Sequence, residues 1–166
     1  MKIARHWKEY QIIATGDGQK LERWGNVILL RPDPQVIWRA EIDMQNYPGL
    51  NAVYIRNNSG GGRWHVKKQF SDSWTIKYKD YVFLVKPTGF KHTGLFPEQA
   101  VNWDMMEELI KKRGGGSKIL NLFAYTGAAT ISALNAGAHV THVDASKGMV
   151  AWAKENAAVS GLANEP

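Results

Sequence analysis

The chain of 166 residues contains no cysteine. Disulfide bonds, thiolate metal sites and a cysteine nucleophile are therefore excluded within it. Long apolar runs are also missing, because even Val27–Leu30 and Tyr81–Val85 are far too short to cross a bilayer. Residues 1–10 lack the apolar segment of a secretory signal. These absences predict a cytoplasmic protein with no membrane partner.

The charge is distributed unevenly along the chain. Residues 1–97 hold 15 Lys+Arg and 8 Asp+Glu, a net charge of +7, whereas residues 98–166 hold 6 and 7, a net charge of −1. A basic first part indicates a polyanionic partner, for which RNA is our hypothesis. The alternative is an ordinary solvated surface, because the basic residues are spread out rather than clustered.

Residues 1–97 have the pattern of a small β-rich domain. Short β-prone runs alternate with segments rich in turn residues, and these runs are 27–30, 35–38 and 52–55. The runs 74–78 and 81–85 flank Lys79-Asp80 and predict a β-hairpin with a two-residue turn. The aromatic residues of this part, which include five of the seven Trp, indicate a packed core more than a base-stacking surface.

Residues 98–166 change to an alternation of helices and strands. The expected elements are a helix over 98–113, a strand over 118–122, a helix over 127–136, a strand over 139–143 and a helix that runs to about residue 160. This order predicts a parallel sheet with helical crossovers. We therefore expect an α/β fold, with a truncated Rossmann-like domain in β-α-β-α order over 98–166 after the β-rich domain over 1–97.

The segment Ile119–Ile131 predicts a cofactor site. A buried strand enters a turn of small residues that opens a helix, and Asp144 ends the next strand. Small residues let a ligand approach the backbone, the helix start supplies free N–H groups, and a carboxylate at the next strand end suits ribose hydroxyls. The turn has one glycine, Gly127, where a pyrophosphate binder needs three. The pattern therefore favours S-adenosylmethionine over NAD.

At these residues a resemblance becomes specific. NLFAYTGAAT, followed by HVDASKGMVAWAKENAAVSG, resembles the class I methyltransferases that include the large-subunit ribosomal RNA cytosine-C5 methyltransferases. The upstream run KHTGLFPEQ is similar to the segment that these proteins place before their first Rossmann helix. The resemblance covers residues from about 74 to 161, and it implies methyl transfer from S-adenosylmethionine to a base in RNA.

The resemblance also implies a set of cofactor-binding residues. It implies that the turn lines the methionine side of the cofactor, that Asp144 holds the ribose, that Ala145 and Ser146 lie near the adenosine, and that Phe96 and Gln99 close over the site. The turn residues are Phe123, Ala124, Tyr125, Thr126 and Gly127, and the remaining candidates are Lys91 and Asn121.

No catalytic or metal-binding residue is expected in this chain. The resembling proteins carry an Asp-Pro-Pro motif and, in cytosine-C5 members, a nucleophilic cysteine, in a part that would follow Pro166. His139 and His142 lie three apart on a strand, so they point to opposite faces and do not form a metal site.

We therefore expect the isolated chain to be inactive and to associate with itself through an exposed sheet edge. The two rival hypotheses are a nucleotide-dependent oxidoreductase-like binder and a non-catalytic RNA-binding fragment.

Overall fold

The computed structural model of the protein describes residues 3–58 and 60–165. These residues form two compact units, which are described separately. Unit 1 comprises Met1–His6, Lys77–Leu84 and Leu95–Pro166, and unit 2 comprises Trp7–Ile76 and Val85–Gly94. Each unit draws on more than one segment of the chain, and the domain boundary at residue 97 stays a prediction.

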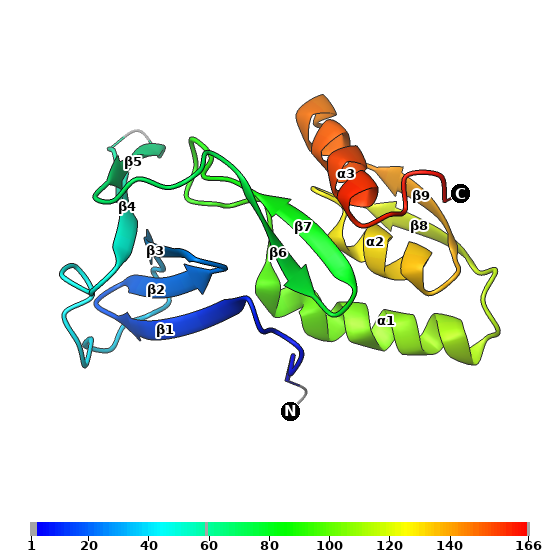
Figure 1. Ribbon diagram of the computed structural model, residues 1–166, viewed down its shortest axis with the longest axis horizontal. Helices are drawn as coiled ribbons and strands as arrows, with labels where there is room; N and C mark the ends of the chain where they lie inside the picture. Colours follow the sequence, from blue (N-terminus) through cyan, green and yellow to red (C-terminus); the bar gives the residue numbers. More distant parts are fainter. Residues whose placement is uncertain (1–2, 59, 166) are drawn as a thin grey trace. The chain divides into compact units, whose positions relative to one another are not determined.

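Unit 2 is built on one five-stranded sheet (Figure 1). Its strands lie across the sheet in chain order and are β1 (Tyr10–Gly16), β2 (Gln19–Trp24), β3 (Val27–Pro32), β4 (Leu50–Arg56) and β5 (Gly62–Val66). Neighbouring strands are antiparallel except β3 and β4, which are parallel. Residues 33–49 connect the two parallel strands without a helix or a strand of their own.

The core of unit 2 lies between one face of this sheet and the connection over residues 33–49. Leu21, Leu30 and Val53 come from β2, β3 and β4, and they are buried against Met44 of the connection. Side chains alternate between the two faces of a strand, so every second residue of the short β-prone runs points toward this core. The core therefore positions β4 beside the connecting segment.

The expected strand over 35–38 is wrong, because this run belongs to the connection. The carbonyls of Val36 and Trp38 accept hydrogen bonds from the N–H groups of Gly18 and Asp17, at 2.8 and 2.7 Å. These bonds replace the hydrogen-bond ladder that a strand would form with its neighbour. Asp17 and Gly18 both have positive φ, as the tight turn between β1 and β2 requires. Pro32 and Pro34 before the run favour a turn over a strand, and Ile37 is 90% exposed.

The predicted hairpin is confirmed. β6 (Trp74–Tyr78) and β7 (Tyr81–Val85) form a two-stranded sheet joined by Lys79-Asp80. Lys79 has a φ of 50°, so a residue other than glycine takes the left-handed position of the turn.

Unit 1 contains the predicted alternation of helices and strands. After the 3₁₀ helix η1 (Pro97–Gln99) come α1 (Ala100–Lys112), β8 (Lys118–Leu122), α2 (Ala128–Asn135), β9 (His139–Val143) and α3 (Lys147–Val159). β8 and β9 are parallel, with Lys118 paired to His139 and Leu122 paired to Val143. The parallel β-α-β-α expectation is therefore confirmed (Figure 1).

The two-stranded sheet of β8 and β9 is covered on one face. Ile119 and Val140 of the covered face pack on a buried cluster formed by Ile110 of α1 with alanines of α2 and of the segment that follows it. The opposite face exposes alternate residues, among them Leu120, Leu122 and Val143. The helices therefore lie on the side of the sheet that faces away from these apolar residues. None of the helices in the described part of the chain has the length and apolar character needed to span a membrane.

Candidate functional site

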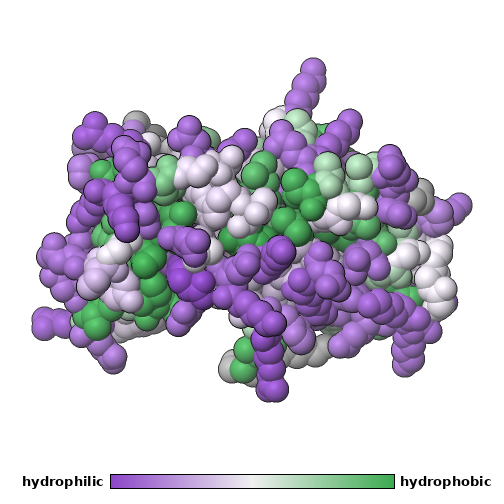
Figure 2. All heavy atoms as spheres, viewed as in Figure 1, coloured by the Kyte–Doolittle hydropathy of each residue, from purple (hydrophilic) through white to green (hydrophobic). Residues whose placement is uncertain are grey.

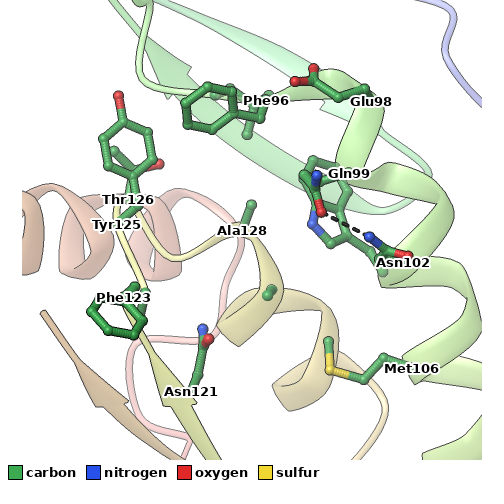
Figure 3. Close-up of a pocket in the computed structure, with 14 residues that line it drawn as sticks. Phe96, Glu98, Gln99, Asn102, Met106, Asn121, Phe123, Tyr125, Thr126 and Ala128 are labelled. Atoms are coloured by element: carbon green, nitrogen blue, oxygen red, sulfur yellow. Dashed lines mark hydrogen bonds between the residues drawn. The ribbon is translucent and has the colours of Figure 1, made fainter.

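A pocket of about 540 Å³ lies in unit 1, where α1, the turn after β8 and the start of α2 come together. Figure 3 shows Gln99, Asn102 and Met106 on the α1 side of the pocket, and Asn121 pointing into it from β8. Its volume is in the range typical of small-molecule sites. The lining residues are Leu95, Phe96, Glu98, Gln99, Asn102, Trp103, Met106, Asn121, Phe123, Ala124, Tyr125, Thr126, Ala128 and Ala129.

The turn over residues 123–127 brings the backbone to the edge of this pocket. Phe123, Tyr125 and Gly127 have φ values of 54°, 52° and 86°, so three of five residues are in the left-handed region. Such conformations are strained outside glycine, and they persist only where surrounding contacts hold them. A Cβ on Gly127 would lie 2.9 Å from Cβ of Ala153, so that position requires glycine for space as well as for φ.

Two hydrogen bonds hold the turn to the end of β9. The N–H of Ala124 donates to the carbonyl of Val143 at 3.0 Å, and the N–H of Tyr125 donates to Oδ2 of Asp144 at 2.9 Å. Oδ1 of Asp144 accepts from the N–H of Ser146, also at 2.9 Å. These two bonds lower the pKa of Asp144 below its usual value, so the group stays a carboxylate. Each oxygen keeps a second lone pair for another donor.

Amide side chains give the pocket its polar character. Nδ2 of Asn102 in α1 donates to Oε1 of Gln99 in η1 at 2.8 Å, so these two amides are held together on one wall. On the opposite wall, Nδ2 of Asn121 donates to Oγ1 of Thr130 at 3.0 Å. Oγ1 of Thr130 in turn lies 2.9 Å from Nδ1 of His142, whose pKa is lowered by burial. This chain of contacts fixes the Asn121 amide at the pocket wall.

Aromatic rings supply the apolar part of the pocket. The rings of Phe96 and Tyr125 lie 5.3 Å apart with an interplanar angle of 45°. Figure 3 shows the two rings side by side at one end of the pocket. Phe123 is 92% exposed, so the residue after β8 offers its ring to the outside of the turn.

The structure brings seven of the twelve predicted cofactor residues to the pocket lining, and they are Phe96, Gln99, Asn121, Phe123, Ala124, Tyr125 and Thr126. Gly127 follows them directly and is the N-cap of α2. Asp144 is tied to the turn, whereas Ala145 is exposed and Ser146 caps α3 by accepting from the N–H of Met149. Lys91 belongs to unit 2, where Nζ donates to the carbonyl of Pro32 at 3.4 Å. Its role in a cofactor site stays a prediction.

Much of the α1 wall of the pocket was not predicted from the sequence. Asn102, Trp103 and Met106 follow Gln99 at intervals of three, four and seven residues, which is the spacing of one helix face. That spacing is visible in the sequence, but which face of a helix meets the turn depends on tertiary packing. No group of three or more potential metal-ligating side chains occurs in the described residues.

The parallel strands, the turn with positive φ and the aspartate tied to it define the Rossmann-like fold of the class I S-adenosylmethionine-dependent methyltransferases. No family model matches the chain. It is 37% identical to an S-adenosylmethionine-dependent methyltransferase from Agrobacterium tumefaciens, with a TM-score of 0.90 over 96% of this chain and 51% of that protein. A structure described as a methyltransferase and holding S-adenosylhomocysteine has the same fold, at 22% identity and a TM-score of 0.69, over 95% of this chain and 43% of that one.

Among curated proteins, the chain resembles the ribosomal RNA large subunit methyltransferase K/L of Shewanella. The identity to the protein of strain W3-18-1 is 41% over 81 residues, which is 48% of this chain. The matched region is 11% of the length of that relative. The chain is therefore similar to class I S-adenosylmethionine-dependent methyltransferases, ribosomal RNA methyltransferases among them, and it spans only part of their length.

Proposed function

We propose that the unit 1 pocket binds S-adenosylmethionine and that the protein transfers its methyl group to a base in RNA. The main observation that supports binding of this cofactor is the strained turn over 123–127, which is held to Asp144 beside a pocket of about 540 Å³. The methyltransferases of the same fold support the cofactor over a nicotinamide dinucleotide. The names of the ribosomal RNA relatives support RNA as the substrate and a cytoplasmic location.

The residues present fit the parts of this cofactor. The Asp144 carboxylate keeps lone pairs that suit two ribose hydroxyls, and Ala145 and Ser146 follow it on the side assigned to the adenosine. The amides of Asn121 and Gln99 suit the amino and carboxylate groups of the methionine part. Ala128 and Ala129 place the start of α2, with its free N–H groups, at the same pocket.

The reaction needs a methyl group directed in line at a nucleophilic atom of the base. When bound, S-adenosylmethionine supplies a sulfonium that activates the methyl group. The residues of this chain bind and orient the reactant, and Phe96 and Tyr125 exclude water from one end of the pocket. No residue of the chain is assigned to base activation, and the cytosine-C5 specificity of the resembling family stays a prediction.

Isothermal titration calorimetry tests which cofactor the chain binds. S-adenosylhomocysteine should bind the chain with one-to-one stoichiometry, and NADH should give no saturable heat. Asp144→Ala should weaken S-adenosylhomocysteine binding by about tenfold or more, because it removes the ribose acceptor and releases the turn. Lys154→Ala on α3 is the matched control and should bind like the parent chain. Saturable binding of NADH with none of S-adenosylhomocysteine would support the oxidoreductase hypothesis instead.

A further inference from the structure

Unit 2 contains a groove of about 370 Å³ that the proposed cofactor site does not use. It lies along β4 and β5, beside the end of β3 and the connecting segment. Its floor includes Val53, which is buried, and Ile55, which is 47% exposed. Its other lining residues are Gln19, Pro32, Gln45, Tyr54, Arg56, His65 and Lys67.

Three basic side chains lie around this apolar floor. His65 is paired across the sheet with Val53, Arg56 is the last residue of β4, and Lys67 follows β5. All three are exposed. Nζ of Lys67 donates to the carbonyl of Gln45 at 2.5 Å, which fixes its position and leaves two of its three protons for a ligand. Figure 2 shows hydrophilic side chains next to apolar ones on the drawn face of unit 2, at the left of the view.

The cations of unit 2 differ in whether a carboxylate neutralises them. Arg31 is buried in a two-point ion pair with Glu22, at 2.6 and 2.8 Å. Lys20 lies 3.5 Å from Asp33. In contrast, Arg56 makes no ion pair with any residue in the described ranges 3–58 and 60–165. The charge of Arg56 at the groove is therefore available to an anion, as is the charge of other exposed cations of unit 2, such as Arg39, away from the groove.

Lys91 adds to the charge at one end of the groove. Its Nζ contacts the carbonyl of Pro32, a lining residue, at 3.4 Å. Burial lowers the pKa of Lys91, and the nearby charge of Arg56 lowers it further, whereas Asp33 raises it. Positive potential that carboxylates do not cancel is the condition under which an anion binds. Near the groove, Asp33 is paired with Lys20. Hydrogen bonds from Asn46 lower the pKa of Asp43, and the nearby charge of Lys67 lowers it further, so this carboxylate offsets part of the charge of Lys67.

We propose that this groove binds the phosphate backbone of single-stranded RNA, with Arg56 and Lys67 contacting phosphates. The apolar floor suits a ribose or a base edge of an unpaired strand. The amides of Gln19 and Gln45 add hydrogen-bonding groups at the wall. The choice of RNA as the polyanion rests on the proposed function, whereas the groove itself rests on unit 2 alone.

The test uses the full chain and a fluorescein-labelled single-stranded RNA of about 12 nucleotides, a length in the range of known single-strand sites. Fluorescence anisotropy gives the affinity at several salt concentrations. The double variant Arg56→Ala, Lys67→Met should bind on the order of tenfold more weakly, and its salt dependence should be shallower by about 0.7 per lost phosphate contact. Arg39→Ala removes an exposed arginine of the same unit outside the groove and should bind like the parent chain.

Calorimetry with S-adenosylhomocysteine on the same samples separates this proposal from the proposed function. The double variant should keep the cofactor affinity of the parent chain, which shows that unit 1 is folded, and an unchanged circular dichroism spectrum shows that unit 2 keeps its strands. Equal RNA affinity in the double variant and the parent would overturn the proposal that the groove binds RNA. An equal loss of RNA affinity in Arg39→Ala would also overturn it. Binding to phosphatidylserine vesicles without binding to RNA would overturn it too. Groove-dependent RNA binding without S-adenosylhomocysteine binding would support the groove and contradict the proposed function.

Discussion

At the scale of single residues, Asn156 of α3 connects the predicted cofactor turn to the hairpin. Its side chain is buried, with 1% exposed. Nδ2 donates to the carbonyl of Thr126 at 2.8 Å, and Oδ1 accepts from the N–H of Leu84 at 2.7 Å. One amide therefore satisfies a backbone group of the turn and one at the edge of β7. A buried backbone group without a partner costs about 1–3 kcal/mol.

Asn156→Asp should separate these two roles. The carboxylate can still accept from Leu84, but it cannot donate to Thr126, so two acceptors face each other. We expect a loss of about 2–4 kcal/mol in the free energy of unfolding and at least about tenfold weaker S-adenosylhomocysteine binding. Chemical denaturation and calorimetry measure the two effects.

Ser160→Ala provides the control for this change. Oγ of Ser160 also bonds the β7 backbone, at Val82, but it does not reach the turn. It should lower stability by about 1 kcal/mol and leave the cofactor affinity unchanged. An equal loss of affinity in both variants would show that Asn156 acts only through general stability.

At the scale of elements, α1 is tied to the hairpin turn by a network centred on Glu107. Its carboxylate accepts from Nζ of Lys111 at 2.5 Å, from the hydroxyl of Tyr81 at 2.6 Å and from Nζ of Lys79 at 2.9 Å. Burial raises the pKa of Glu107, but these bonds outweigh burial and lower it to about 2. Burial, with the bond to Glu107, raises the pKa of Tyr81 to about 12. The network therefore keeps its charge state over the neutral range.

The sign of the pKa shift predicts how stability depends on pH. Because the folded pKa of Glu107 is depressed, its contribution is fully present above the ordinary value of 4.5 and is lost as the pH falls toward about 2. Glu107→Gln should lower the free energy of unfolding by about 1–3 kcal/mol at pH 7. The difference from the parent chain should shrink between pH 4.5 and pH 2. Urea titrations across this range measure it, and a difference that stays constant would exclude Glu107 as the titrating group.

Elements with a strong local pattern could be predicted from the sequence, and those decided by tertiary contacts could not. β8, α2, β9 and α3 were expected in order because their apolar spacing and flanking glycines are local signals. The run 35–38 has strand-like residues, yet its carbonyls bond the turn between β1 and β2. The turn over 123–127 was expected to line a pocket from its small residues, whereas the α1 face that completes the pocket was not.

At the scale of the whole molecule, the bare face of the β8–β9 sheet predicts self-association. Leu120, Leu122 and Val143 are 61%, 53% and 43% exposed on one face, and β8 pairs only with β9 among the described strands. Apolar side chains beside free strand edges favour contact with another chain. Sedimentation equilibrium should show an average mass that rises with concentration.

Two leucines of similar exposure allow a matched test of this surface. Leu122→Lys should reduce the association, whereas Leu109→Lys on α1, where the leucine is 55% exposed, should not. A parent chain that stays monomeric at every concentration would contradict the prediction, and so would an equal effect of the two substitutions.

The central claim is that the turn over 123–127 and Asp144 hold S-adenosylmethionine in the unit 1 pocket. The most direct measurement is a crystal structure of the chain grown with S-adenosylhomocysteine. The account predicts density for the ligand between α1 and the turn, with the ribose hydroxyls within hydrogen-bonding distance of Asp144 and the amino acid part near Asn121 and Gln99. A ligand bound elsewhere, or in this pocket with its ribose away from Asp144, would contradict the account.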